Sequence, residues 1–355
     1  MKPFEKILTA HIQKYPKLQP RDIVKLALQS EYGNSHMISD ENAMLERLKD
    51  EINSVPVRED EELFENIGEK YVRLNLASPE ARELSPEIIN KMFIISSKEK
   101  SENSYAFESK LICAANMANR GLLPCSAKEF GEYLEYYTKR HMGEAMSHST
   151  LYREAYSPSY RVVLSVWEKL IPLIKIVQNA AKAEERVILA IDGMAASGKS
   201  TAAKYLSQIF DAPIIHTDHF FLPPELRTKS RMDEPGGNLH RERFFTDVVQ
   251  KLAIGEDFEY QLFDCSKNVL GQSIKIPASK VTIIEGAYSL HPDFGNYANV
   301  KVCMTIGAQT QSHRIMKRNG AIMHKRFLTE WIPLENRYLK YFDIGALCDL
   351  TVDTL

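Results

Sequence analysis

Residues 193–201 combine glycines, a lysine and two hydroxyl side chains at a spacing suited to phosphate binding. The stretch reads Gly-Met-Ala-Ala-Ser-Gly-Lys-Ser-Thr and matches G-x-x-x-x-G-K-[ST] at every fixed position. Glycines let the backbone curl so that successive N–H groups point toward an anion, and a following helix adds its positive amino-terminal end. The residues that we expect to bind the phosphates of a nucleotide are Gly193, Ala195, Ala196, Ser197, Gly198, Lys199, Ser200 and Thr201.

Two of these side chains have a chemical role of their own. The Lys199 ammonium can reach the terminal phosphates and assist catalysis, and the Ser200 hydroxyl is a suitable ligand for Mg²⁺. The alternative is a glycine turn with a surface lysine. The context argues against that alternative, because the apolar run 187–192 precedes the loop and a helical pattern at 200–210 follows it.

The C-terminal half alternates between strand-like and helix-like patterns. Apolar strand-like runs occupy 187–192, 212–216, 281–286 and 301–307, and helical patterns occupy 200–210, 242–255 and 309–320. This alternation predicts an α/β P-loop NTPase domain over 186–355, with a parallel sheet and helices on both faces.

The N-terminal half shows helical periodicity and few stretches that alternate with period two. Helical patterns lie at 20–32, 38–53, 85–98, 104–119 and 126–142. We therefore predict an all-α N-terminal domain of unknown role over residues 1–155, and a connecting helix over 156–185.

Composition limits the class of protein. The 355 residues carry 45 Lys and Arg against 47 Asp and Glu, so the net charge of −2 argues against nucleic acid as a partner. The five cysteines are scattered without C-x-x-C spacing, and no apolar run reaches membrane length. These features predict a cytoplasmic protein with reduced thiols and no membrane partner, and they are compatible with a homo-oligomer.

Several ordered segments after the loop narrow the class further. They are HTDHFFLPPELRT (216–228), RMDEPGGNLHRERF (231–244), IIEGAYSLHP (283–292), QTQSHRIMKRNG (309–320) and WIPLENRYLKYF (331–342). Together they resemble the uridine kinase and phosphoribulokinase-like branch of P-loop kinases, in particular bacterial uridine kinase-like proteins that carry an additional N-terminal region. The resemblance covers roughly 186–355. It implies an ATP- and Mg²⁺-dependent kinase that transfers the γ-phosphoryl group to a hydroxyl of a nucleoside, uridine-like or related.

Three kinds of side chain have expected roles in this chemistry. Asp218 follows the second strand, and the resemblance implies that it faces the acceptor hydroxyl and accepts its proton. Glu285 ends the strand at 281–286, where a carboxylate can hold Mg²⁺. Arg314 and Arg318 resemble lid arginines that stabilise the moving phosphoryl group. The ordinary alternatives are a helix cap for Asp218, an ion pair for Glu285 and a solvated basic face for the arginines.

The acceptor pocket departs from the family pattern. Uridine kinases typically follow a tyrosine with a histidine and an arginine that recognise the nucleoside, and the stretch 258–271 lacks that pair. Asp264 could instead bind a pair of polyol hydroxyls. The candidate substrate residues are Asp218, Phe220, Asn238, His240, Arg241, Tyr260 and Asp264. Two other functions therefore stay open: a sugar or polyol kinase, and a nucleotide-gated binding or regulatory ATPase module.

The N-terminal half offers two weaker candidate sites. Metal ligation by histidines would require convergence that no H-x-x-x-H or H-E-x-x-H spacing supports, so satisfied structural side chains are favoured. The residues considered are Glu31, His36, His141 and His148 for a metal, and Tyr152, Arg153, Tyr160 and Arg161 for an aromatic-basic surface.

Overall fold

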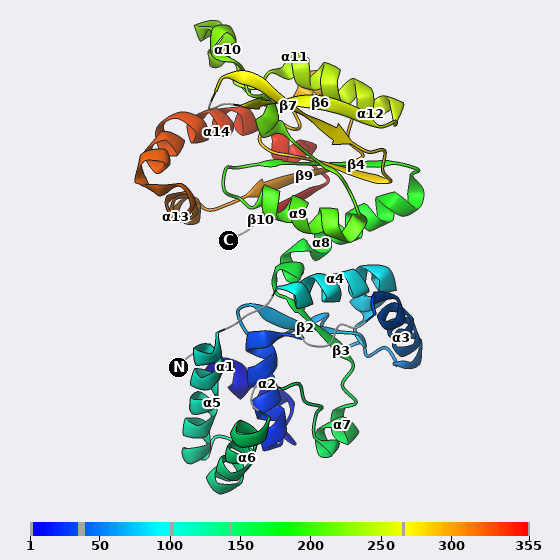
Figure 1. The fold of residues 1–355 in the computed structure, drawn as a ribbon, viewed down its shortest axis with the longest axis vertical. Helices are drawn as coiled ribbons and strands as arrows, with labels where there is room; N and C mark the ends of the chain where they lie inside the picture. The colour runs from blue at the N-terminus through cyan, green and yellow to red at the C-terminus, as the bar shows by residue number, and fades with distance from the viewer. Residues whose placement is uncertain (1–2, 35–39, 100–102, 142–143, 265–266, 354–355) are drawn as a thin grey trace. The chain divides into compact units, whose positions relative to one another are not determined.

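The computed structural model describes residues 3–34, 40–99, 103–141, 144–264 and 267–353. Contacts within the chain divide it into two compact units, residues 1–168 and 169–355. Figure 1 shows helices and strands in both units, and each unit is described by itself. No helix in the described part of the chain is both long enough and apolar enough to cross a membrane.

The N-terminal unit is not all-α, so that prediction was wrong. Its strands β1 (Phe64–Asn66), β2 (Tyr71–Asn75) and β3 (Tyr160–Leu164) form an antiparallel sheet in the order β1-β2-β3. The strands are short, and four consecutive residues of β2 are buried. A strand buried on both faces shows no alternation of apolar and polar residues, which is why periodicity missed it.

Helices make up most of the rest of this unit. They are α1 (Pro3–Lys14), α2 (Pro20–Tyr32), α3 (Glu41–Ser54), α4 (Pro86–Lys98), α5 (Ser104–Asn119), α6 (Ala127–Arg140) and α7 (Thr150–Tyr156), with a 3₁₀ turn at Pro79–Glu83. Capping residues set several of their starts. The Ser85 hydroxyl accepts a hydrogen bond from the Ile88 amide, and Ser126 forms the expected capping box with Glu129.

The segment predicted as a connecting helix, 156–185, is helical only in part. It contains strand β3 and then helix α8 (Val166–Ala183), which continues through Pro172. Because β3 pairs with β2, residues 160–164 belong to the sheet of the N-terminal unit rather than to a linker.

The C-terminal unit is built on five parallel strands in the order β10-β9-β4-β8-β5. They are β4 (Val187–Gly193), β5 (Ile214–His216), β8 (Val281–Glu285), β9 (Val300–Thr305) and β10 (Leu350–Asp353). The sequence patterns had indicated all of them except β10. A separate antiparallel hairpin, β6 (Phe258–Asp264) with β7 (Val269–Ile276), was also missed.

Helices cover both faces of the parallel sheet. Helix α9 (Lys199–Phe210) packs against β4, β5 and β8. Ala190 of β4 and Ile284 of β8 belong to a different core cluster, which also contains Phe244 and Leu252. Successive side chains of a strand point to opposite faces, so both faces of β4 are buried. This arrangement confirms the predicted α/β architecture.

The other helical elements of this unit surround the sheet and extend from it. They are α10 (Lys229–Asp233), α11 (Arg241–Phe244), η4 (Phe245–Val249), α12 (Gln250–Ile254), α13 (Ala308–Arg326), η6 (Phe327–Trp331) and α14 (Ile332–Tyr341), with short 3₁₀ turns η2 (Thr217–Phe220), η3 (Pro224–Leu226), η5 (Pro292–Phe294) and η7 (Ile344–Leu347). Residues 308–341 form a continuous arm, coloured orange to red in Figure 1, which follows β9. We call these residues the arm.

Candidate phosphate-binding site

The glycine-rich loop lies between a central strand and the start of a helix. Strand β4 pairs with β8 on one side and β9 on the other, so its carboxyl end lies in the middle of the sheet edge. The loop leaves this strand at Gly193, and α9 begins at Lys199. This strand–loop–helix order is the context that the motif requires. The C-terminal unit is therefore an α/β protein with a P-loop.

Backbone conformation explains why glycine stands at the two fixed positions. Gly193 has a φ of 128°, and a Cβ atom built there would lie 2.1 Å from the Met304 carbonyl oxygen. Gly198, which caps α9, has a φ of 105°. Ala196 between them also takes a positive φ, 56°, so the loop curls tightly over few residues.

Gly193→Ala should destabilise the C-terminal unit by about 3 kcal/mol, because the new methyl group would press on the backbone of β9 in a strained conformation. Thermal unfolding measures this change. Gly345→Ala is the matched control, since a Cβ atom there meets no atom within 4 Å and φ is unstrained. Equal unfolding temperatures for the two variants would contradict the described loop geometry.

Lys199 is bound to its own loop. Its Nζ atom donates hydrogen bonds to the carbonyl oxygens of Gly193 and Met194, both at 2.9 Å, and the side chain is buried. An ammonium group has three N–H donors, so these bonds use two of them. The lysine charge is therefore fixed beside the curled backbone.

A hydroxyl, a carboxylate and an imidazole meet at the neighbouring strand ends. The Ser200 hydroxyl donates to Glu285 Oε1 at 3.0 Å, and His216 Nδ1 lies 2.5 Å from the same oxygen. His216 and Glu285 are register partners at the ends of β5 and β8. The hydrogen bond to Glu285 raises the pKa of His216. Sequence reasoning had singled out Ser200 and Glu285 but not His216.

The oxygen atoms of Ser200 and Glu285 fit a magnesium ion. Mg²⁺ prefers oxygen ligands and commonly uses one or two carboxylates together with substrate phosphates and water. Within the described residues, no cluster of three or more His, Cys, Asp or Glu side chains is arranged for a metal. A site with one carboxylate, one hydroxyl and phosphate oxygens does not require such a cluster.

Asp218 lies at the same sheet edge, two residues after β5. Its side chain is accessible to water, and it interacts electrostatically with Glu285 and Lys199. Partial loss of hydration and the like charge of Glu285 raise the pKa of Asp218, while Lys199 opposes the rise. The structure therefore brings together Asp218, Lys199, Ser200 and Glu285.

The arm contributes further contacts to the loop. Arg314 donates a hydrogen bond to the Ala196 carbonyl oxygen at 3.1 Å, and Gln311 Nε2 donates to the Ala195 carbonyl oxygen at 2.9 Å. Arg318 is exposed and donates to Asn319, but its charge also acts on Asp218. Gln311 was not predicted, because a glutamine within a mostly polar helical sequence does not stand out from its neighbours.

A buried aspartate accepts hydrogen bonds from the first residue of the loop and from the backbone that follows β8. Asp192, the residue before Gly193, accepts hydrogen bonds from the amides of Gly193, Tyr288 and Leu290 at 2.6, 3.2 and 2.9 Å. It also accepts one from the Tyr338 hydroxyl at 2.8 Å. Burial nevertheless raises its pKa. This residue was overlooked because it ends an otherwise apolar strand and looks like the start of a turn.

The predicted substrate residues occupy several different environments. Phe220 is fully buried and packs on Phe244 and Tyr260. The Tyr260 hydroxyl lies 3.0 Å from His219 Nδ1. Asp264 ends β6, where it accepts a hydrogen bond from the Lys267 amide. Phe220 is thus a core residue, whereas the Tyr260 hydroxyl contacts His219, the residue that follows Asp218.

The remaining candidates belong to the Gly236–Gly237 loop and helix α11. Arg241 binds Glu234 and lies 3.0 Å from Asp293 and 3.1 Å from His291, so its charge is already balanced. His240 caps α11. Asn238 has a buried Oδ1 atom with no hydrogen-bond partner among the described residues. Arg241 and His240 therefore stabilise the local fold. The Asn238 Oδ1 atom remains able to accept a hydrogen bond.

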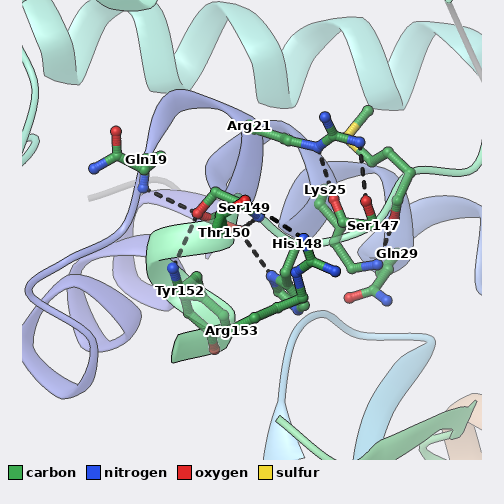
Figure 2. Close-up of polar contacts among 12 residues, drawn as sticks. Gln19, Arg21, Lys25, Gln29, Ser147, His148, Ser149, Thr150, Tyr152 and Arg153 are labelled. Carbon is green, nitrogen blue, oxygen red and sulfur yellow. Dashed lines mark hydrogen bonds and ion pairs between the residues drawn. The ribbon is translucent and has the colours of Figure 1, made fainter. Parts of the chain in front are cut away.

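In the N-terminal unit, the segment 146–150 is held on helix α2 by side-chain contacts, as Figure 2 shows. Asp22 receives hydrogen bonds from the Ser149 amide and hydroxyl at 3.0 and 2.6 Å and lies 2.8 Å from His148 Nδ1. His148 Nε2 in turn lies 2.6 Å from the Tyr160 hydroxyl. Burial lowers the pKa of His148 to about 4, so the ring is neutral at pH 7.

The structure does not bring the N-terminal metal candidates together. Glu31 pairs with Lys110 and His141 with Glu144, while His148 is occupied as described above. His36 lies outside the described residues.

The weaker alternative, an aromatic-basic surface, is not supported either, and the structural role that the sequence favoured is what Tyr152 and Arg161 show. Tyr152 is 1% exposed and stacks on His148 at 4.1 Å, and Arg161 pairs with Glu51. These side chains stabilise the fold of the unit.

Acid should weaken this unit through Glu65. Although burial alone would raise its pKa, Arg73 at 2.9 Å is the main cause that holds the pKa of Glu65 at about 2. A depressed pKa stabilises the folded state above the ordinary pKa of glutamate, and this contribution is lost as the pH falls from about 4.5 to 2. We expect a loss of about 2 kcal/mol.

Hydrogen exchange of the β2 amides, followed from pH 5 to pH 2.5, would measure this loss. Amide protection in the Glu65→Gln variant should vary less over that window than in the unaltered protein. Identical pH profiles for the two proteins would mean that Glu65 is not the group responsible.

Comparison with known proteins gives partial likenesses in structure only. No protein-family model and no curated protein matches this chain. A structure described as a possible uridine kinase from Bacillus stearothermophilus is 18% identical over 53% of this chain and 99% of its own, with a TM-score of 0.42. Deoxyadenosine kinase from M. mycoides with bound dATP is 15% identical over 47% of this chain and 91% of its own, with a TM-score of 0.22. Likenesses of this size carry no functional argument, so the fold assignment rests on the sheet and the loop.

Proposed function

We propose that this protein is an ATP- and Mg²⁺-dependent kinase that transfers the γ-phosphoryl group to a hydroxyl of a nucleoside or related small molecule. The observation that supports this most is the convergence of Lys199, the Ser200–Glu285 pair and Asp218 at one sheet edge. Open α/β sheets bind their ligands at the carboxyl ends of the strands. The motifs that resemble uridine kinase-like proteins support the same assignment.

The roles of the residues follow from their chemistry. Mg²⁺ held by Ser200 and Glu285 would neutralise phosphate charge when MgATP is bound. Asp218 accepts the proton of the acceptor hydroxyl. At the same time the hydroxyl oxygen bonds to the γ-phosphorus, and the bond between the γ-phosphorus and the β–γ bridging oxygen breaks. Lys199, together with Arg314 and Arg318 of the arm, stabilises the charge on the transferred group.

Polar side chains of the C-terminal unit would recognise the acceptor. Tyr260, Asn238 and Asp264 are the polar candidates that would recognise it, and they suit a nucleoside or a polyol. Arg241 and His240 would act indirectly, through the shape of the Gly236–Gly237 loop.

A panel assay tests the proposal. The full-length protein is incubated with ATP, Mg²⁺ and a series of nucleosides, sugars and polyols, and ADP release is followed. We expect release that depends on one class of acceptor, with a phosphorylated product detected by mass spectrometry. Slow hydrolysis that is indifferent to every acceptor but altered by a macromolecule would instead favour a regulatory ATPase module.

A further inference from the structure

One carboxylate of the arm is bound to the candidate phosphate loop itself. Glu335 lies in α14, and its Oε2 atom accepts a hydrogen bond from the Ala195 amide at 2.8 Å. Amides of a curled glycine-rich loop are the groups that bind anionic oxygens. A carboxylate oxygen therefore occupies a position of the loop that suits a phosphate oxygen.

Side chains of the arm bind both carbonyl oxygens and an amide of the same short backbone segment. Gln311 and Arg314 donate to the carbonyl oxygens of Ala195 and Ala196, while Glu335 accepts from the Ala195 amide. Only the last of these contacts competes directly with an anion, because carbonyl oxygens do not bind phosphate. The competition thus concerns a single side chain.

Helix α14 is anchored independently of Glu335. Tyr338, one turn further along, is buried and donates to Asp192 beneath the loop. We therefore place any displacement at the Glu335 side chain, which can rotate away while the helix stays attached to the sheet.

Burial of the Glu335 carboxylate makes its ionised form costly. Burial raises the pKa of Glu335 to about 7, against the attraction of Lys199 and the hydrogen bond from Ala195. The charged or titratable groups that act on it from neighbouring elements are Lys199 of α9, Asp218 of η2, Asp192 of β4 and Tyr288 after β8. Moving this carboxylate into water would relieve the cost of burial.

We propose that Glu335 is an internal competitor for the phosphate loop, which the phosphate chain of a nucleotide must displace from the Ala195 amide in order to bind. The inference rests on the proposed function, since it requires that the loop bind phosphate. It assigns to Glu335 a role in setting nucleotide affinity rather than in the transfer step.

Two measurable consequences follow. Removing the competitor in Glu335→Ala should tighten binding of the phosphate chain by at least about tenfold, the worth of one hydrogen bond to a charged group. Displacement should also return Glu335 to the ordinary pKa of an exposed glutamate. Binding at pH 6.5 should then release roughly 0.7 of a proton from this residue, and binding at pH 8.5 almost none.

Calorimetry on the full-length protein tests both consequences. The probes are Mg²⁺ with the imido analogue of ATP, which is not cleaved, and inorganic tripolyphosphate, which has no base or sugar. Affinity is measured at pH 8.5, and proton release at pH 6.5 is obtained from two buffers of different ionisation enthalpy. Glu335→Gln keeps the side-chain shape without a titrating group, and its proton release is subtracted from that of the unaltered protein.

Glu330→Ala is the matched control, because Glu330 lies on the same arm and pairs with Arg326 instead of the loop. We expect tighter binding of both probes by Glu335→Ala alone, and a proton release that Glu335→Gln lacks. Binding by the unaltered protein with no gain in Glu335→Ala, or with equal proton release in Glu335→Gln, would overturn this inference alone. No binding of either probe by any variant would overturn the proposed function as well.

Discussion

Lys199→Ala should lower the rate of phosphoryl transfer by about 100- to 1000-fold while leaving the fold intact. A preorganised donor beside developing charge typically contributes this much, and Lys199 is fixed by two hydrogen bonds at the centre of the candidate site. The substitution removes charge near the terminal phosphates but leaves the strand–loop–helix backbone in place. Steady-state kinetics with the acceptor found in the panel assay measures the loss.

The control for this experiment is Lys204→Ala. Lys204 lies on the same helix α9, but its side chain is exposed. It should keep the activity of the unaltered protein, and circular dichroism should give similar unfolding curves for all three proteins. Transfer at an undiminished rate by Lys199→Ala would be incompatible with the proposed function.

The sequence predicted the C-terminal unit better than the N-terminal one for a physical reason. The P-loop motif constrains backbone and chemistry together, so it indicated β4, the loop and α9 at once. Parallel strands such as β8 are buried apolar runs that end in polar residues. The ends of two such runs indicated Asp218 and Glu285 as candidate site residues. In contrast, β1 to β3 are short, and although β1 and β2 are neighbours in sequence, β2 also pairs with β3, which lies far along the chain at 160–164. No local pattern reveals that pairing.

The residues that were missed share one property. Asp192, His216, Gln311 and Glu335 acquire their significance from contacts that cross 69 or more sequence positions. Residue type alone gave no reason to prefer them over other polar side chains. Arg241 differs from these residues, because its residue type suggested ligand binding. Its ion pairs with Glu234 and Asp293 instead indicate that it stabilises the fold.

Asp218→Asn separates the transfer step from nucleotide binding. Asparagine has nearly the same shape as aspartate but cannot accept the proton of the acceptor hydroxyl, and loss of a general base typically lowers turnover by about 100- to 10,000-fold. Asp218 forms no part of the loop, so the affinity for the imido analogue of ATP should change little. Kinetics and calorimetry on the same preparation give the two quantities.

The comparison between the two quantities decides the role of Asp218. Asp233→Asn, an exposed position at the end of α10, serves as the control and should match the unaltered protein in both measurements. If turnover and nucleotide affinity fell in Asp218→Asn by the same factor, Asp218 would act in nucleotide binding, near Lys199 and Glu285. A large loss of turnover with unchanged affinity is what a residue facing the acceptor should give, because its contribution arises only as the hydroxyl gives up its proton.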